Sequence, residues 1–265
     1  MFLFHLLCTV MTKNFAFLVN SSQYWKNMRH SANMHVFYKL LRNNGFDDSE
    51  MVIFTADDFS FDERTYHFGK YQTSTIRPAV TKLPFGPFTP EMIYETIMGN
   101  HEKLIDMDSN SNFFIYFTGH GNEYFLKLHN KHFITTPCLE TALIKLSKRV
   151  KRAFVIFDTC RAESLLVKET LPENIVVLTT SNFNEDSMSF TFSHDDDICS
   201  VDDFADFVQI HSEKGFNKTI LRFFEEISRD FKVASTLTLY PKIDWKISDF
   251  IVQDNTEKEI EKFIL

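Results

Sequence analysis

Two unbroken apolar runs in the chain each lead directly into a reactive side chain. Residues 113–117 run into Thr-Gly-His120-Gly, and residues 153–157 run into Asp-Thr-Cys160. An apolar run of this length, without alternation, predicts a strand buried on both faces, as in a parallel sheet covered by helices. Ligands of such sheets bind outside the carboxyl ends of the strands. We therefore expect His120 and Cys160 to face one crevice, an arrangement that suits a cysteine nucleophile and its base.

Strands and helices alternate over the first 180 residues, which predicts a parallel-dominated α/β sheet with helices on both faces. Thr89 followed by Pro90 is typical of a helix start, and Gly45 fits the position just beyond a helix end. Beyond residue 190 the pattern is weaker. The predicted strands are 15–19, 51–54, 113–117, 125–129, 132–135, 153–157, 174–180, 235–240 and 247–252. The predicted helices are 24–44, 89–101, 137–149, a short helix after Cys160 and a helix near 217–229.

Composition limits the class of protein further. With 44% hydrophobic residues among 265, the chain can build a full core, and we expect one catalytic domain over residues 13–254 with a tail at 255–265. A net charge of −8 argues against nucleic-acid binding, which needs a basic face. No apolar run reaches the roughly 18 residues of a membrane-spanning helix. Residues 1–12 are a possible signal segment, or else an N-terminal strand or a disordered tail, because they are apolar but lack a basic start and a clean cleavage site.

The chemistry of a cysteine nucleophile fits both motifs. A free thiol is only a few per cent ionised near neutral pH, so a histidine within reach and a helix beginning just after Cys160 would favour the thiolate. The amides of Gly121 and Cys160 are candidate oxyanion donors. Taken singly, a cysteine ending a buried strand is usually a small core residue, and a histidine between glycines is usually a turn residue. The four cysteines form no C-x-x-C pair, so we expect no zinc site.

The two motifs resemble the catalytic signatures of the legumain-like branch of caspase-fold cysteine peptidases. Within that branch the chain is most similar to the catalytic subunits of glycosylphosphatidylinositol (GPI) transamidases. Residues 25–33, Trp-Lys-Asn-Met-Arg-His-Ser-Ala-Asn, are similar to their Trp-x-Asn-Tyr-Arg-His-x-Ala-Asn helix, and residues 181–189 resemble their Ser-Gln-x-Gly-Glu-Asp-Ser-x-Ser loop, where legumains differ. Residues 247–250 resemble a late Ile-Thr-Asp-Phe strand. The resemblance covers most of residues 14–190 and returns in patches at 235–250.

The resemblance implies a caspase-like sheet of about six strands and a role for each matching residue. His120 is the implied general base, Cys160 the nucleophile and Asn27 the residue that orients the histidine. Without the resemblance, Asn27 fits a polar helix face equally well. No metal is expected, because an acidic calcium-binding stretch of relatives has no counterpart around residues 79–87. Four residues are implied in or near the pocket for the residue before the scissile bond: Arg29, Asp158, Asp186 and Ser187.

The resemblance also implies a function. We expect a transamidase of the endoplasmic reticulum lumen, membrane-associated through the other subunits of a membrane-embedded complex and without a cofactor. Its substrates are then the C-terminal signal peptides of proproteins and the GPI lipid. A legumain-like asparaginyl endopeptidase, in which water resolves the thioester, is the alternative within the same chemistry. A non-catalytic scaffold subunit that keeps the fold is the alternative from another class.

Overall fold

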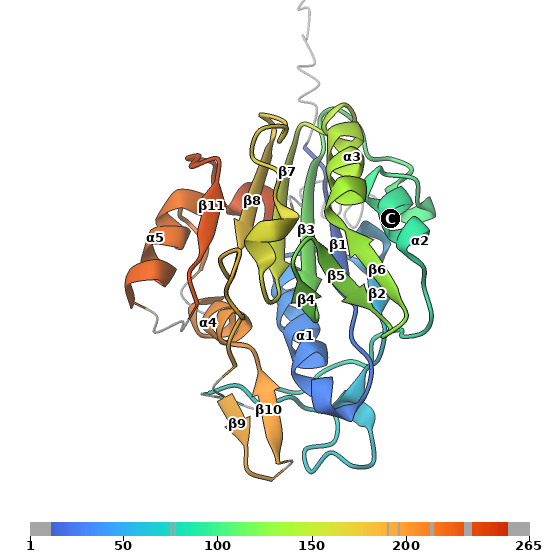
Figure 1. Cartoon of the computed structure of the whole chain (residues 1–265), viewed down its shortest axis with the longest axis vertical. Helices are drawn as coiled ribbons and strands as arrows, with labels where there is room; N and C mark the ends of the chain where they lie inside the picture. The colour runs from blue at the N-terminus through green and yellow to red at the C-terminus, as the bar shows by residue number, and fades with distance from the viewer. Residues whose placement is uncertain are drawn as a thin grey trace, which may run out of the picture.

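A six-stranded sheet forms the centre of the molecule (Figure 1), as the computed structural model shows for residues 12–74, 76, 78–189, 191–195, 197–212, 215–230 and 235–253. The strand order is β11-β8-β7-β3-β1-β2. All neighbours are parallel except β11, which runs antiparallel to β8 at one edge. This confirms the predicted parallel-dominated sheet. The strands are β1 (Asn14–Asn20), β2 (Met51–Thr55), β3 (Asn112–Thr118), β7 (Arg152–Asp158), β8 (Ile175–Thr179) and β11 (Thr238–Tyr240).

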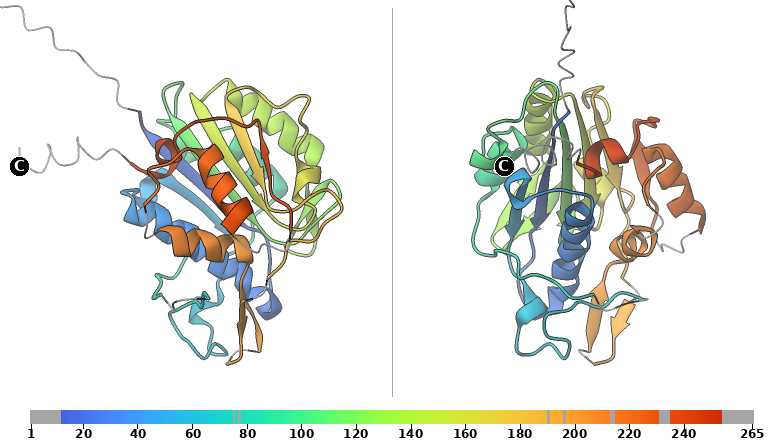
Figure 2. Two further views of the ribbon diagram at one scale, coloured as in Figure 1. Left: turned by 90° about the vertical axis from the view of Figure 1, so that its left-hand side faces the viewer. Right: turned by 180° about the vertical axis from the view of Figure 1, so that it is seen from behind.

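Helices cover both faces of the sheet and create two cores (Figure 2). Successive side chains of a strand point to opposite faces, so Leu18 of β1 packs in one core while Phe17 and Val19 pack in the other. The continuous apolar runs are therefore explained by burial on both sides. The helices are α1 (Met28–Asn43), α4 (Asp203–Ser212) and α5 (Ile220–Asp230) on one face, and α2 (Pro90–Ile97) and α3 (Thr136–Ser147) on the other.

Glycines in the left-handed conformation end two of the helices. Gly45 has φ 94° and follows α1, where the amide of Phe46 bonds the carbonyl of Leu41, as predicted. The prediction that the second helix reaches residue 101 is wrong. That helix, α2, stops at Ile97 because Gly99, with φ 85°, closes it in the same way. At its start, α1 is preceded by a 3₁₀ turn, Trp25–Asn27.

Three further corrections concern the later part of the chain. The strand predicted at 247–252 is a short helix, α6 (Ser248–Ile251), which buries Phe250 and Ile251 on one side. An antiparallel pair, β9 (Thr191–Ser193) and β10 (Ile198–Val201), and helix α4 form where no element was predicted. The short helix after Cys160 is a 3₁₀ turn of four residues, Ala162–Leu165.

The strands predicted at 125–129 and 132–135 form a hairpin that belongs to a small sheet beside the main one. The strands β4 (Gly121–Asn122), β5 (Phe125–Leu128) and β6 (His132–Thr135) are antiparallel neighbours. The first eleven residues of the possible signal segment and the tail at 255–265 lie outside the described residues. In the part of the chain that is described, no helix has both the length and the apolar character needed to cross a membrane.

Candidate active site

The register of the central strands brings His120 and Cys160 to the same edge of the sheet. Thr118 at the end of β3 pairs with Asp158 at the end of β7, and each reactive residue lies two positions further along its own strand. The hydroxyl of Thr159 donates to the carbonyl of Gly119 at 2.8 Å and joins the two loops. The structure therefore places the two segments side by side, as the apolar runs predicted.

Asn27 contacts the imidazole of His120 and determines which nitrogen carries the proton. The Asn27 Nδ2 donates to the carbonyl of Gln23 at 2.6 Å, which turns Oδ1 towards the histidine. Oδ1 lies 2.8 Å from His120 Nε2. An amide oxygen only accepts hydrogen bonds, so Nε2 carries the hydrogen and Nδ1 remains free to accept a proton. This geometry is the one that the orienting role implied for Asn27 requires.

The surroundings of His120 keep its ring neutral. Burial, with smaller effects of the Arg29 and Lys127 charges, lowers the pKa of His120 to about 4. The edge of the ring packs against His30, with ring centroids 5.1 Å apart. Near neutral pH the imidazole is therefore unprotonated, the form that a general base needs.

Cys160 is half-buried, and its thiol is not ionised in advance. Burial raises the pKa of the Cys160 thiol, and the carboxylates of Asp186 and Asp202 act in the same direction. Within the described residues its Sγ has one hydrogen-bond contact, with the Ser187 carbonyl at 3.9 Å, and none with His120. The expected help from a helix dipole is absent at Cys160, because a four-residue 3₁₀ turn has few aligned peptide units. Contacts between catalytic groups often tighten only when substrate binds.

Gly121 lies directly against the backbone of Cys160. A Cβ atom at this position would come within 2.4 Å of both the Cys160 carbonyl oxygen and the Thr159 Oγ1. Glycine is therefore required for the close approach of β4 to the end of β7. The two expected oxyanion donors, the amides of Gly121 and Cys160, belong to neighbouring backbone segments.

Arg29 pairs with an aspartate that the sequence did not single out. Its Nε lies 3.0 Å from Asp202 Oδ1, and Asn33 Nδ2 donates to the other carboxylate oxygen of Asp202 at 2.6 Å. The Asp202 amide in turn donates to Asn33 Oδ1. The only sequence signal for Asp202 was the acidic composition around residues 195–203. Its partners on α1 are about 170 residues away in the chain, and local sequence patterns cannot predict a contact between such distant residues.

Asp158 and Ser187 belong to one hydrogen-bond network, whereas Asp186 is not part of it. Asp158 is 1% exposed and accepts from Tyr116 at 2.7 Å and from Thr180 at 3.0 Å. The Thr180 hydroxyl also lies 3.4 Å from that of Ser187. Burial, together with repulsion from Asp202, raises the pKa of Asp158 to about 7. Asp158 thus lies beneath the surface of the expected pocket, while Asp186 is exposed to solvent.

The loop at residues 181–189 is anchored beside Cys160 by Glu185. Its carboxylate accepts from the amides of Asn182 and Thr236, at 2.9 and 2.8 Å. Its own carbonyl accepts from the amide of Arg161, the residue after Cys160, at 2.7 Å. The loop that carried the resemblance to transamidases is therefore a fixed wall of the candidate site.

Comparison with known proteins identifies the family. Residues 14–249 match the Peptidase C13 family. The chain is 28% identical over 262 residues to a putative GPI-anchor transamidase of Drosophila melanogaster, with 90% of this chain and 74% of that protein covered. It is 27% identical over 249 residues to the GPI-anchor transamidase of Saccharomyces cerevisiae and 29% over 232 residues to that of Bos taurus. These two matches cover 88% and 82% of this chain but 56% and 55% of the relatives.

The fold has a known counterpart among solved structures. The crystal structure of caspase-1 from Spodoptera frugiperda superposes with a TM-score of 0.54 at 11% identity and covers 92% of this chain and 93% of the caspase chain. This likeness shows a caspase-like fold, as expected from the resemblance. Because the family match extends over most of the chain, the protein belongs to the Peptidase C13 family.

Proposed function

We propose that the chain is the catalytic subunit of a GPI-anchor transamidase. The observation that carries the proposal is the arrangement of Asn27, His120 and Cys160, in which a neutral imidazole with a free Nδ1 stands beside the strand end that bears a thiol. The names of the relatives supply the substrate class. The anchored loop around Glu185 supports the same choice.

The reaction begins with attack of Cys160 Sγ on the carbonyl carbon of a small residue near the substrate's C-terminus. His120 Nδ1 takes the thiol proton, and the amides of Gly121 and Cys160 stabilise the oxyanion. The intermediate collapses to a thioester as His120 returns the proton to the leaving amine of the signal peptide. The amine of a GPI ethanolamine phosphate then attacks the thioester and gives up a proton. The new amide bond forms and Cys160 leaves as a thiol.

The pocket for the small residue is assigned to Arg29, Ser187 and Asp186, with Asp158 beneath them. Arg29 is held by Asp202, and Ser187 is held by Thr180 and contacts the Cys160 sulfur through its carbonyl. GPI signals carry small residues at the attachment site. A shallow pocket at the sheet edge suits that substrate.

The proposed setting is the lumen of the endoplasmic reticulum, with membrane association through the other subunits of a membrane-embedded complex. The proposed organisation is one catalytic domain over residues 13–254. The GPI lipid and the proprotein signal are both membrane-bound, so a catalytic domain must be held at the membrane surface to meet them.

The proposal is tested in cells that lack the transamidase catalytic subunit. Expression of the chain should restore surface display of a GPI-anchored reporter, and the Cys160→Ala variant should not. Equal rescue by the Cys160→Ala variant would show a scaffold function and would refute catalysis.

Membership of a peptidase family favours one second candidate, an asparaginyl endopeptidase. The same thioester would then be resolved by water. Purified chain incubated with an Asn-containing peptide and hydroxylamine separates the two. A transamidase should yield mainly the hydroxamate, because an amine-type acceptor intercepts the thioester, whereas an endopeptidase should yield mainly the free acid.

A further inference from the structure

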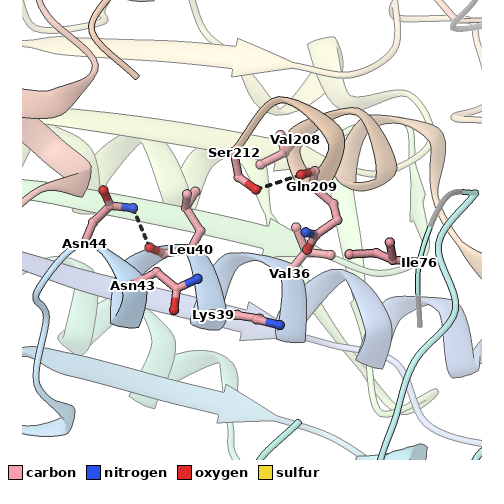
Figure 3. Close-up of a pocket in the computed structure, with 9 residues that line it drawn as sticks. All are labelled: Val36, Lys39, Leu40, Asn43, Asn44, Ile76, Val208, Gln209 and Ser212. Carbon is pink, nitrogen blue, oxygen red and sulfur yellow. Dashed lines mark hydrogen bonds between the residues drawn. The ribbon is translucent and has the colours of Figure 1, made fainter. Parts of the chain in front are cut away.

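The acceptor of the proposed reaction must bind within reach of the thioester on Cys160. A cavity of about 270 Å³ lies between α1 and α4 (Figure 3). Val36 is the lining residue of α1 nearest to Asn27 in the chain, nine positions or about 13 Å of helix away. A cavity at that distance cannot hold an amine against the thioester. The residues that bind the reacting end of the acceptor must therefore lie in the segments that border Cys160.

Arg161 is the residue next to Cys160, and its guanidinium points to the segment after His120. Its Nη1 lies 2.6 Å from Glu123 Oε1. Its backbone amide donates to the Glu185 carbonyl at 2.7 Å, so the main chain is held at this position as well. The side chain is 32% exposed, and among the described residues its other guanidinium nitrogens have no partner. A positive charge with free donors is thus fixed beside Cys160.

The stability of the fold does not account for the pair of Arg161 and Glu123. Both side chains are in contact with solvent, and an exposed ion pair contributes little to stability. Arg161 also has a φ of 55°, the left-handed conformation that is unfavourable for a long side chain. Such strain is concentrated at functional sites, where the surrounding structure enforces it. Both observations indicate that Arg161 is placed for a ligand.

The ethanolamine phosphate of GPI has the chemistry that this guanidinium recognises. It is a phosphodiester with a single negative charge, and only an ethylene group and one oxygen separate its amine nitrogen from phosphorus. When the amine attacks the thioester on Cys160, the phosphate must lie close to the neighbouring side chain. The planar fork of a guanidinium matches two phosphate oxygens. Water, the competing acceptor, has no charge for this group to recognise.

We infer that Arg161 binds the phosphate of the acceptor and thereby favours transfer over hydrolysis. The inference rests on the proposed function, because it concerns the second step of that reaction. There the amine nitrogen bonds the thioester carbon, the bond from carbon to sulfur breaks, and His120 passes the amine proton to sulfur. Arg161 forms no covalent bond and gives up no proton. Glu123 holds the guanidinium in place while its remaining donors bind the phosphate.

The test compares two soluble acceptors for the purified full chain acting on a GPI-signal peptide. Glycerophosphoethanolamine carries the phosphodiester, and ethanolamine carries the amine without it. The wild type should prefer glycerophosphoethanolamine roughly 10-fold, the size expected for one charge-assisted contact. Arg161→Gln should abolish this preference, and Arg161→Lys should keep part of it, since the charge remains without the fork. A wild type without the preference, or Arg161→Gln with it, would overturn the inference.

Hydroxylamine distinguishes a failure of this inference from a failure of the proposed function. Hydroxamate formation without a preference for the phosphodiester would remove the role of Arg161 and leave transamidation standing. Free acid as the only product with every amine would refute both. Lys168→Gln is the matched control, because it removes the other 2.6 Å pair near Cys160, with Glu163, and should keep the preference.

A reporter protein provides a second readout in cells that lack the transamidase catalytic subunit. Transfer gives an anchored reporter and hydrolysis a secreted one, so the sum of the two measures thioester formation. Arg161→Gln should lower the ratio of anchored to secreted reporter, whereas Lys168→Gln should not. A parallel fall of both products at a constant ratio would show a merely structural role and would contradict the inference.

Discussion

At the scale of single residues, His120 and Cys160 rest as a neutral pair. Burial lowers the pKa of His120 to about 4 and raises the pKa of the Cys160 thiol. Both effects have the same origin, since a group removed from water resists charging. In the proposed reaction the proton therefore moves from sulfur to His120 Nδ1 as the substrate is attacked, and not beforehand.

This resting state predicts the pH dependence of Cys160 alkylation. The rate with iodoacetamide should keep rising between about pH 7 and pH 9, because the thiolate fraction is still increasing there. Mass spectrometry of the Cys160 peptide measures the rate, and the exposed Cys138 of the same chain serves as the internal reference. A rate that is constant from about pH 6 upward would reveal a preformed thiolate–imidazolium pair and contradict the neutral resting state.

The contact between Asn27 and His120 leads to a second prediction about pH dependence. Asn27→Asp keeps an acceptor for the Nε2 hydrogen of His120 but adds a negative charge beside the ring, which raises the pKa of His120. The acid limb of the pH–rate profile for thioester formation should therefore move to higher pH. Asn27→Ala should instead lower the rate by roughly 10²-fold without that displacement, because the general base loses its orientation. Equal acid limbs in the wild type and Asn27→Asp would contradict the assigned contact.

The raised pKa of the buried Asp158 leads to a prediction of how the stability of the fold changes with pH. Burial, with a smaller effect of the Asp202 charge, raises the pKa of Asp158, so the folded state keeps a proton on Asp158 up to about pH 7, whereas the unfolded chain releases it near pH 4. The folded state then binds more protons over this window, and the contribution of Asp158 to the free energy of unfolding falls as pH rises. Asp158→Asn should remove this decline. Urea titrations at about pH 5 and pH 8 measure it, and an unchanged decline in the variant would refute the assignment.

At the scale of elements, the candidate site depends on the close approach of β4 to the end of β7. Gly121 is the point of contact, and Thr159 adds a hydrogen bond from the loop after β7 to Gly119. Each of these two contacts joins residues of different segments of the chain. The small sheet therefore aligns the segment after His120 with Cys160.

Gly121→Ala is expected to disturb this contact. The added methyl would meet backbone and side-chain oxygens at 2.4 Å, so β4 must shift away from Cys160. Thioester formation should fall by roughly 10²-fold, the size expected for loss of one oxyanion donor. Gly86→Ala is the matched control, because its methyl would meet nothing within 4 Å. If both variants keep wild-type rates, the Gly121 amide has no part in catalysis.

Elements with a strong local pattern could be predicted from the sequence, and those shaped by distant contacts could not. The apolar runs predicted β3 and β7, because a strand buried on both faces is apolar at successive positions. They thereby also predicted that His120 and Cys160 lie at the same edge of the sheet. The segment at 247–252 was wrongly predicted to be a strand because it is short and apolar. Its buried residues Ile247, Phe250 and Ile251 are spaced by three and four, which is helical. Asp202 was missed because its role depends on Arg29, a residue of another element.

At the scale of the whole molecule, the two ends of the described chain are joined by hydrogen bonds between Asn14 and the last two described residues, Val252 and Gln253. The Asn14 amide donates to Gln253 Oε1, and Gln253 Nε2 donates to the Asn14 carbonyl, both at 3.0 Å and both buried. β1 is an inner strand of the sheet, so this pair attaches the last described segment to the centre of the fold. Gln253 thereby completes the hydrogen bonding of a backbone position that no neighbouring strand satisfies.

Gln253→Ala should lower the free energy of unfolding by about 2–4 kcal/mol, because it leaves a buried N–H and a buried carbonyl without partners. Denaturant titration at constant m-value measures the loss, and Asn217→Ala, at an exposed position, is the control. An unchanged stability would show that water satisfies the Asn14 backbone, and that the Asn14 Nδ2 bond to the Val252 carbonyl and the surrounding packing suffice to hold the two chain ends.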